Sequence, residues 1–571
     1  MKLKITEKHD FFFLMTTGVL IGAFLRLYRI GSQIIWDDEW HAIQIAIFNP
    51  LKYIVTHFHW NYNSIPLTIY FRIMLESIGL NEINIRLPQL LSGTLMLVIF
   101  PLIIKKLFNK RIALIFLFLI AISPLLVYFS RNSLSYSTVV LLSFISIFSF
   151  YQWMKEKKTI YVSTYIVTAV LAPYFHISSV AFVSAPILYV IILSMIKKRP
   201  SFNNEFKNIP QVKHILFIIF GFIVGISICF FPLIKTMEPI MKHSSKGYID
   251  IGTLGGCAIL FSGSKSYIIC IILLTLFVYG LYVLYVTNKL LFTYLSAICL
   301  SQLLYIVIPR PFLVQKPIIF TRYFLPSLPI WLLIISIALN GLHTKLKSFI
   351  ENKTKVVNAY SNLALVSLLL ILFMTGPITD VYGFPNDFTN HKDFQYNYIH
   401  LKRILNKSDS HERLYPKFYV NLKEQAHNMT IIEFPANISW QWNFYHVYQR
   451  LHKNRVKIGY NSDEFGPFFG YDTFENRDVG FNNFIDISNP KQLSVKEADF
   501  IVVHKNIWKE CVTVGWFDPE NRKKMEDRLS ILPVSTLEPL QKYVSRTIAK
   551  LKSAFGKPFY EDSWIIVHRV K

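Results

Sequence analysis

The sequence predicts a polytopic α-helical membrane protein that carries a small extracytoplasmic α/β domain at its C-terminal end. Hydrophobic residues make up 53% of the 571-residue chain, and a mean hydropathy of +0.37 is too high for a soluble protein of this length. Apolar stretches of roughly 20 residues, the length that crosses a bilayer, recur as far as residue 376. After Thr375 the composition becomes charged and aromatic. We therefore expect a membrane domain over 1–376 and a second domain over 377–571.

The membrane domain is expected to contain about eleven transmembrane helices. The first is a membrane helix rather than a signal peptide, because no small-residue cleavage site follows it. The division near residue 176 rests only on the stretch from Pro173 to Ser179, since no charged residue separates the two apolar runs there. The expected segments are 11–29, 89–107, 112–129, 135–153, 160–176, 177–196, 214–234, 266–287, 290–308, 322–342 and 358–376.

Lysine and arginine clusters orient these helices. With the N-terminus inside and eleven helices, the basic clusters at 105–111, 155–158, 197–199 and 345–355 all face the cytoplasm, as the positive-inside rule requires. The first outward loop is then 30–88, and the loops 235–265 and 309–322 are also outside. We therefore expect a multi-pass protein of the cytoplasmic membrane whose C-terminal domain is outside.

The net charge of +25 fits cytoplasmic loops beside anionic membrane lipids, and we expect no nucleic acid as a partner. Five cysteines lack CxxC or metal-ligand spacing and are expected to be packing residues. The sequence contains no glycine-rich phosphate loop, HExxH or GxSxG, so nucleotide-driven transport has no support.

The C-terminal region contains short apolar runs between polar, turn-rich segments. The runs Thr430 to Phe434, Asp499 to Val503 and Trp564 to Val567 are typical of buried strands. A region of this size can form its own core, and we interpret it as a small α/β domain outside the membrane.

Three consecutive acids, Asp37, Asp38 and Glu39, stand at the start of the first outward loop. Carboxylates beside a membrane helix are costly unless water or a partner compensates them, so they are candidates for function. A solvated loop or the start of a helix explains them equally well, because acids are favourable in the first turn of a helix. The apolar residues later in this loop predict short helices along the membrane interface.

Further motifs follow in a fixed order, and together with the Asp-Glu pair they carry a family resemblance. They are Arg86-Leu87-Pro88, Ile122-Ser123-Pro124, Ser130-Arg131-Asn132-Ser133-Leu134-Ser135-Tyr136, Tyr174-Phe175-His176, Phe320-Thr321-Arg322-Tyr323-Phe324-Leu325-Pro326, Ile432-Glu433-Phe434-Pro435, the stretch Tyr448 to Tyr460, and Ala498 to His504. This order resembles the GT-C class of membrane glycosyltransferases, in the branch of protein O-mannosyltransferases and lipid A aminoarabinose transferases.

The resemblance implies a polyprenyl- or dolichyl-phosphate sugar as donor, a hydroxyl-bearing acceptor (a lipid, a glycan or a protein), and Asp38 as the general base. We therefore expect an inverting hexosyl or pentosyl transferase that acts on the outer face of the membrane in glycosylation of the cell envelope. A noncatalytic membrane scaffold and a transporter of envelope glycan precursors are the alternatives. The candidate charges lie at one outward rim, whereas a transport path would place them across the helices.

The expected chemistry assigns roles to the outward polar residues. Asp38 accepts the proton of the attacking hydroxyl, and Glu39 orients it. The lipid phosphate gains negative charge as it leaves, so it needs cations, for which Arg131 and Arg322 are favoured. Interfacial snorkelling or contact with lipid headgroups is the alternative explanation for the presence of both arginines. The remaining candidates for the donor site are Tyr136, His176 and Tyr323.

No cofactor is required by these motifs, but a divalent cation is left open. Glu39, His57 and His59 are its candidate ligands, although structural or headgroup roles are the simpler reading of the two histidines. One departure bears on this question. Many relatives read Ser-Arg-Glu-Ala-Arg at the turn after residue 130, whereas this chain has Asn132 at the acidic position and Leu134 at the second arginine position. A second acidic ligand is therefore absent from the turn.

Overall fold

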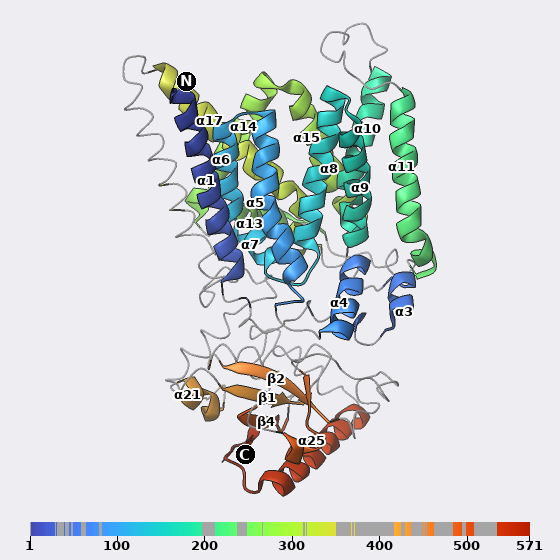
Figure 1. Ribbon diagram of the computed structural model, residues 1–571, viewed down its shortest axis with the longest axis vertical. Helices are drawn as coiled ribbons and strands as arrows, with labels where there is room; N and C mark the ends of the chain where they lie inside the picture. The colour runs from blue at the N-terminus through green and yellow to red at the C-terminus, as the bar shows by residue number, and fades with distance from the viewer. Residues whose placement is uncertain are drawn as a thin grey trace. The chain divides into compact units, whose positions relative to one another are not determined.

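The chain folds as two compact units in the computed structural model (Figure 1). The first, here called the membrane unit, consists of residues 1–28, 50–69 and 86–394. The second, called the outer unit after its expected orientation, consists of residues 29–49, 70–85 and 395–571. The structure describes residues 2–28, 30, 39, 45–46, 49–58, 64–78, 83–196, 212–236, 248–264, 266–311, 314–315, 317–349, 367, 371, 416–423, 429–435, 448, 452, 454–461, 484–493, 498–506 and 534–570.

The membrane unit is a bundle of apolar helices (Figure 1). Seven helices in the described part of the chain are long and apolar enough to cross a membrane, or eight if the bent pair α6 and α7 forms one span. The helices are α1 Lys2–Leu27, α5 Leu87–Leu107, α6 Lys110–Ile122, α7 Pro124–Ser130, α8 Tyr136–Glu156, α9 Thr159–Phe175, α10 Val180–Ile196, α11 Val212–Phe230, α13 Ile251–Ser262, α14 Tyr267–Thr287, α15 Lys289–Val307, α16 Pro317–Phe324 and α17 Leu328–Phe349.

The predicted polytopic helical fold is confirmed. Every expected segment before residue 350 coincides with one of these helices, and the uncertain division near residue 176 is a true break between α9 and α10. Two expected segments are subdivided: α6 and α7 meet at 59° before Pro124, and a short 3-10 turn, Leu325–Ser327, separates α16 from α17. The count of eleven depends on the expected segment 358–376, of which the structure describes only residues 367 and 371, and the domain boundary at 376 lies outside the described residues.

The interpretation of 235–265 as a loop is wrong, because helix α13 occupies Ile251–Ser262. The Asp250 carboxylate caps its first turn by accepting from the backbone N–H of Thr253 at 2.6 Å. Gly263, at φ +66°, ends it in the left-handed conformation that glycine adopts without strain. An apolar helix of 12 residues is too short to cross a bilayer, so a search for spanning segments passes over it.

The segment 30–88, which is expected to be the first outward loop, contains the predicted short helices, α3 Leu51–Thr56 and α4 Ile65–Ser77. In the membrane unit, Phe58 and Ile65 from this loop pack against Phe230 and Leu233, which lie at the end of α11 and in the following 3-10 turn. Burial of these four apolar side chains fixes residues 50–69 to the helix bundle.

The outer unit contains a six-stranded sheet in the order β3-β2-β1-β4-β6-β5 (Figure 1). The first four strands along the chain are parallel, and the C-terminal hairpin adds two antiparallel strands beside β4. The predicted small C-terminal α/β domain is confirmed. Its elements are α21 Lys417–Lys423, β1 Thr430–Phe434, β2 Arg455–Tyr460, β3 Phe484–Asp486, β4 Phe500–His504, α25 Val534–Phe555, β5 Tyr560–Glu561 and β6 Ile565–Arg569.

A buried carboxylate joins the two central strands. Glu433 of β1 and His504 of β4 are both fully buried, and His504 Nε2 lies 2.7 Å from Glu433 Oε2. The Tyr419 hydroxyl of α21 donates to the same carboxylate at 2.8 Å, and the Tyr448 ring stacks on Tyr419 at 4.1 Å. A buried charge is tolerated only with such partners. The network therefore holds α21 against the β1–β4 pair.

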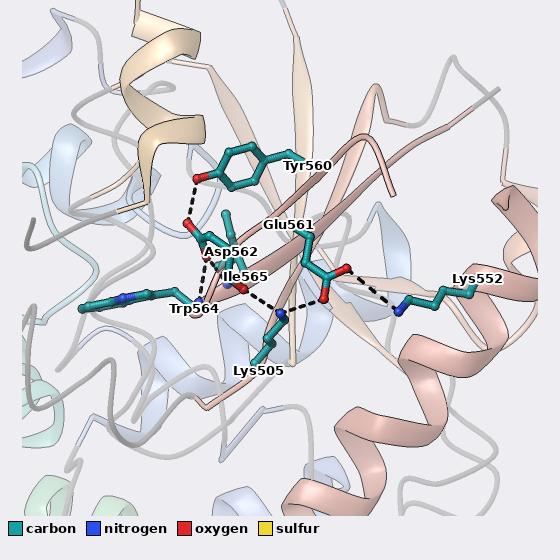
Figure 2. Close-up of polar contacts among 7 residues, drawn as sticks. All are labelled: Lys505, Lys552, Tyr560, Glu561, Asp562, Trp564 and Ile565. Atoms are coloured by element: carbon teal, nitrogen blue, oxygen red, sulfur yellow. Dashed lines mark hydrogen bonds and ion pairs between the residues drawn. The ribbon is translucent and has the colours of Figure 1, made fainter. Parts of the chain in front are cut away.

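The C-terminal hairpin is fixed by a second, more exposed network (Figure 2). Asp562 Oδ1 accepts from the backbone N–H groups of Trp564 and Ile565 at 2.7 and 2.8 Å, which closes the turn between β5 and β6. Lys505 Nζ donates to Glu561 Oε1 at 2.8 Å, and this hydrogen bond holds the pKa of Glu561 below its usual value. The network ties the hairpin to the end of β4.

Removing the buried carboxylate with Glu433→Ala should strongly destabilise the outer sheet, because Tyr419 and His504 are left buried without it. Breaking a buried pair costs about 3–5 kcal/mol, so amide hydrogens of β1 and β4 should exchange roughly a hundredfold or more faster. Hydrogen exchange measured by mass spectrometry on the full-length protein in detergent checks this. The matched control is Glu561→Ala, whose partly exposed pair with Lys505 is worth at most about 1 kcal/mol. Equal exchange rates in the two variants would contradict the assignment.

Candidate functional site

The structure brings four of the predicted donor-site residues together in the membrane unit. The Tyr136 ring lies 5.1 Å from the His176 ring, and the Tyr323 ring lies 6.2 Å from the same histidine, edge to face. Arg322, which is 8% exposed, precedes Tyr323 in the last turn of α16. Residues far apart in the sequence thus form one cluster of two phenols, an imidazole and a guanidinium. We call Tyr136, His176, Arg322 and Tyr323 the aromatic–arginine cluster.

Helix ends place each member of this cluster. Tyr136 is the first residue of α8, and His176 stands at the break between α9 and the 3-10 turn Ile177–Ser179. At this break His176 Nδ1 lies 2.7 Å from the Ser178 hydroxyl, which fixes the orientation of the ring. Arg322 and Tyr323 lie in the last turn of α16, just before the backbone turns at Pro326. Irregular backbone at membrane depth is tolerated where protein buries it. Here the helix breaks place these side chains at helix ends.

Gln302 is a further residue of this region that the sequence interpretation missed. It is fully buried in α15, and its Nε2 donates to the carbonyl of Tyr323 at 2.7 Å and to that of Ser178 at 3.1 Å. One amide group therefore bridges the two breaks that carry His176 and Tyr323. The only sequence signal is a lone glutamine inside an apolar helix, where a polar group must find a partner.

Arg131 ties the turn after α7 to the end of α1. It is 4% exposed, and its Nη1 donates to the carbonyls of Arg26 at 3.0 Å and Tyr28 at 2.8 Å, with a longer contact of 3.4 Å to Leu25. The last carbonyls of a helix have no partner within the helix, so Arg131 acts as a side-chain cap for α1. This gives Arg131 a structural role, and its predicted role at the donor phosphate stays a prediction.

The same turn is held close to α5. Gln89 Nε2 donates to Thr138 Oγ1 at 3.0 Å, while the backbone N–H of Thr138 donates to Gln89 Oε1 at 3.1 Å. A Cβ atom on Gly93 would lie 2.1 Å from Ser130 Oγ, so only glycine allows α5 and the end of α7 this close an approach. The turn from Arg131 to Ser135 is therefore anchored on both sides.

The predicted acids and metal ligands are described only in part. Asp38 and His59 lie outside the described residues, and Glu39 is a buried residue of the outer unit. His57 stacks on Tyr53 at 3.8 Å, and its Nδ1 lies 2.9 Å from the Thr56 hydroxyl. Within the described ranges, no group of three or more His, Cys, Asp and Glu side chains is placed to hold a metal ion. The assignment of Glu39, His57 and His59 as cation ligands stays a prediction.

Comparison with known proteins adds evidence on the family. Residues 66–228 match the model of a family described as dolichyl-phosphate-mannose-protein mannosyltransferase. The match includes Arg131, Tyr136 and His176. The resemblance to the GT-C class is confirmed. The chain is thus similar to this family over a segment that carries two of the four residues of the aromatic–arginine cluster.

Other comparisons give the following results. No curated protein sequence matches the chain. The crystal structure of ArnT from Cupriavidus metallidurans bound to undecaprenyl phosphate is similar over 88% of this chain and 94% of that one, with 10% identity and a TM-score of 0.44. The archaeal oligosaccharyltransferase AglB from Archaeoglobus fulgidus, in complex with an inhibitory peptide and a dolichol-phosphate, is similar over 91% of this chain and 72% of that one, with 12% identity and a TM-score of 0.42.

Gly93→Ala should displace the turn after α7, because the added methyl group overlaps Ser130. Overpacking of this kind costs about 1–3 kcal/mol, and thermal unfolding in detergent should show a lower midpoint. Gly255→Ala is the matched control, since a Cβ atom there meets nothing within 4 Å. It should be neutral or stabilising by up to about 1 kcal/mol through helix propensity. A Gly93→Ala variant as stable as the control would show that the close approach is unimportant.

Gln302→Leu should loosen the two breaks that carry His176 and Tyr323, because the carbonyls of Ser178 and Tyr323 lose their shared donor. An unsatisfied buried group costs about 1–3 kcal/mol, so faster hydrogen exchange is expected over 176–180 and 320–326. Ser301→Ala is the control, because it removes a single side-chain bond to the Ala181 carbonyl from the neighbouring position. Unchanged exchange in Gln302→Leu would exclude the bridging role.

Proposed function

We propose that this chain is an inverting glycosyltransferase that moves a sugar from a polyprenyl-phosphate donor to a hydroxyl acceptor on the outer face of the cytoplasmic membrane. The observation that carries the proposal is the gathering of the aromatic–arginine cluster from three separate helices. The description of the matched family, which names a sugar on a lipid phosphate, supports a donor of this class. The distribution of basic residues supports an orientation with the N-terminus inside and the outer unit outside.

The cluster supplies what a lipid-phosphate leaving group requires. As the bond between the anomeric carbon and the phosphate oxygen breaks, the phosphate changes from a monoanion to a dianion. Arg322 is buried and positively charged, and such a group stabilises developing negative charge more strongly than an exposed one. Tyr136 and Tyr323 offer hydroxyl groups and ring faces suited to a sugar, and His176 lies between them.

The acceptor side of the reaction requires a base. The acceptor hydroxyl attacks the anomeric carbon from the face opposite the phosphate, and its proton passes to the Asp38 carboxylate, so that the configuration at carbon is inverted. Glu39 orients Asp38 in this scheme. No step requires a metal ion: the charge of the leaving phosphate is met by arginine and the proton is taken by a carboxylate. The proposal covers hexosyl or pentosyl transfer to a lipid, glycan or protein hydroxyl.

Asp38→Asn should abolish transfer, because an amide cannot accept the proton of the acceptor hydroxyl. Loss of a general base typically lowers the rate about 10²–10⁴-fold. The measurement is sugar transfer in membranes that carry either protein, supplied with a mixed pool of polyprenyl-phosphate sugars and extracted cell-envelope acceptors. Asp37→Asn is the matched control, since it makes the same chemical change at the adjacent position.

The outcomes separate the possibilities. Transfer by the wild type and by Asp37→Asn, with none by a folded Asp38→Asn, supports the base assignment. Equal transfer by all three proteins removes Asp38 from the chemistry. If the wild type transfers no sugar from any donor in the pool, the glycosyltransferase proposal itself fails, and a scaffold becomes the better explanation.

A further inference from the structure

Asn132 has a buried hydrogen-bond donor for which the described part of the protein provides no acceptor. The residue is 4% exposed and lies in the turn between α7 and α8. Its Oδ1 accepts from the backbone N–H of Leu134 at 3.1 Å, whereas its Nδ2 is shielded from solvent and meets no acceptor among the described residues. Leaving such a group unsatisfied costs about 1–3 kcal/mol, so native proteins rarely retain one without a reason.

The hydrogen bond from the backbone N–H of Leu134 identifies which atom of the Asn132 carboxamide is the oxygen and which is the nitrogen. Oxygen and nitrogen of an asparagine are assigned from the hydrogen-bond network, and a backbone N–H can only donate to the oxygen. The resulting ring between the side chain and the backbone two residues later is a common and stable local turn. It holds Oδ1 against the backbone of the turn and directs the N–H groups of Nδ2 away from it. The donor is therefore held in place before any ligand arrives.

The surroundings favour a negatively charged acceptor over a neutral one. Arg131 is the adjacent residue, and α8 begins at Tyr136 with no acid in its first turn. The Ser135 side chain makes no capping bond there. A helix of 21 residues carries a partial positive charge at this end. A buried donor that follows an arginine in the sequence and precedes a helix N-terminus is better suited to an anionic oxygen than to a sugar hydroxyl.

We propose that Nδ2 of Asn132 donates a hydrogen bond to a phosphate oxygen of the polyprenyl-phosphate donor. This inference rests on the proposed function, and it adds a specific phosphate ligand to the same site. Many relatives of the resembled family carry a glutamate at this position, where a carboxylate repels phosphate unless a cation lies between them. In this chain the amide makes the contact directly. Because Nδ2 is shielded from solvent, the phosphate reaches it as the side chains that cover the turn move aside.

The rigidity of the turn supports a binding role. Arg131 holds one side of the turn to the end of α1, and the paired bonds between Gln89 and Thr138 hold the other side to α5. A donor on such a support loses little freedom when a ligand binds, and this pre-organisation increases affinity.

Asn132→Asp isolates the donor, because aspartate has the same shape and keeps the oxygen that accepts from Leu134, but it offers phosphate a negative charge in place of N–H. The measurement is binding of undecaprenyl phosphate to the full-length protein in detergent, with undecaprenol as a phosphate-free competitor. Asn109→Asp is the matched control, since Asn109 also accepts a backbone N–H through Oδ1, at the start of α6. We expect binding to weaken at least tenfold in Asn132→Asp and to stay within twofold of wild type in Asn109→Asp.

The outcomes test the assignment of Asn132 and the proposed donor class separately. If the wild type binds undecaprenyl phosphate but not undecaprenol, and a folded Asn132→Asp binds as tightly as the wild type, the assignment of Asn132 is overturned while the proposed donor class stands. If undecaprenol competes as well as the phosphate does, the lipid tail alone is recognised, and the assignment is again overturned. If the wild type binds neither lipid, the proposed donor class itself fails. Thermal unfolding of each variant identifies misfolded protein, and Asn132→Ala, which removes the Nδ2 donor without adding a negative charge, then replaces Asn132→Asp.

Discussion

The hydrogen bonds from Arg131 to the end of α1 are the interaction on which the surrounding helix ends of the membrane unit depend. The last carbonyls of α1 have no helical partner, and a membrane protein has little water at that depth to satisfy them. Arg131 meets them from the turn after α7. The end of the first helix is thereby joined to the start of α8, where Tyr136 begins the aromatic–arginine cluster.

Two helix breaks place His176 and Tyr323 in the aromatic–arginine cluster. A continuous α9–α10 helix would satisfy its own backbone and would leave His176 as one more side chain on a helix surface. The Ser178 carbonyl lies in the 3-10 turn after this break, and the Tyr323 carbonyl lies just before the turn at Pro326. Gln302 donates to both carbonyls with one amide group. A single buried side chain thus joins the two segments and sets the distance between them.

Much of the membrane unit could be predicted from the sequence, because long apolar runs and the basic residues beside them indicate which segments insert into a membrane. The strand predictions at Thr430 to Phe434 and Asp499 to Val503 agree with β1 and β4, since buried parallel strands are continuous apolar runs. Helix α13 was not predictable in the same way, because its length falls below a membrane span. The members of the aromatic–arginine cluster were predicted from the order of the motifs alone. Neither Gln302 nor the cap by Arg131 could be predicted, because each depends on backbone carbonyls whose positions exist only once the helices have packed.

Contacts in the fold explain the residues of the C-terminal motifs. Ile432-Glu433-Phe434 and the run that ends at His504 lie far apart in the sequence, yet they form adjacent parallel strands whose polar residues meet in one buried pair. A glutamate within an apolar strand is costly on its own and is tolerated only with its histidine and Tyr419 in place. This mutual requirement explains why the order of the motifs is more informative than any one of them.

The two positions in the turn after α7 that differ from the family motif, Asn132 and Leu134, also depend on each other. Relatives with Ser-Arg-Glu-Ala-Arg have an acid and a second arginine where this chain has Asn132 and Leu134, so the two changes together leave the net charge of the turn unaltered. Leu134 is buried at 7% exposure, a position where an arginine needs a counter-charge and a leucine needs none. Its backbone N–H in turn holds Asn132 in place. The turn keeps one positive charge at Arg131 and exchanges a carboxylate that could hold a cation for an amide that can itself contact phosphate.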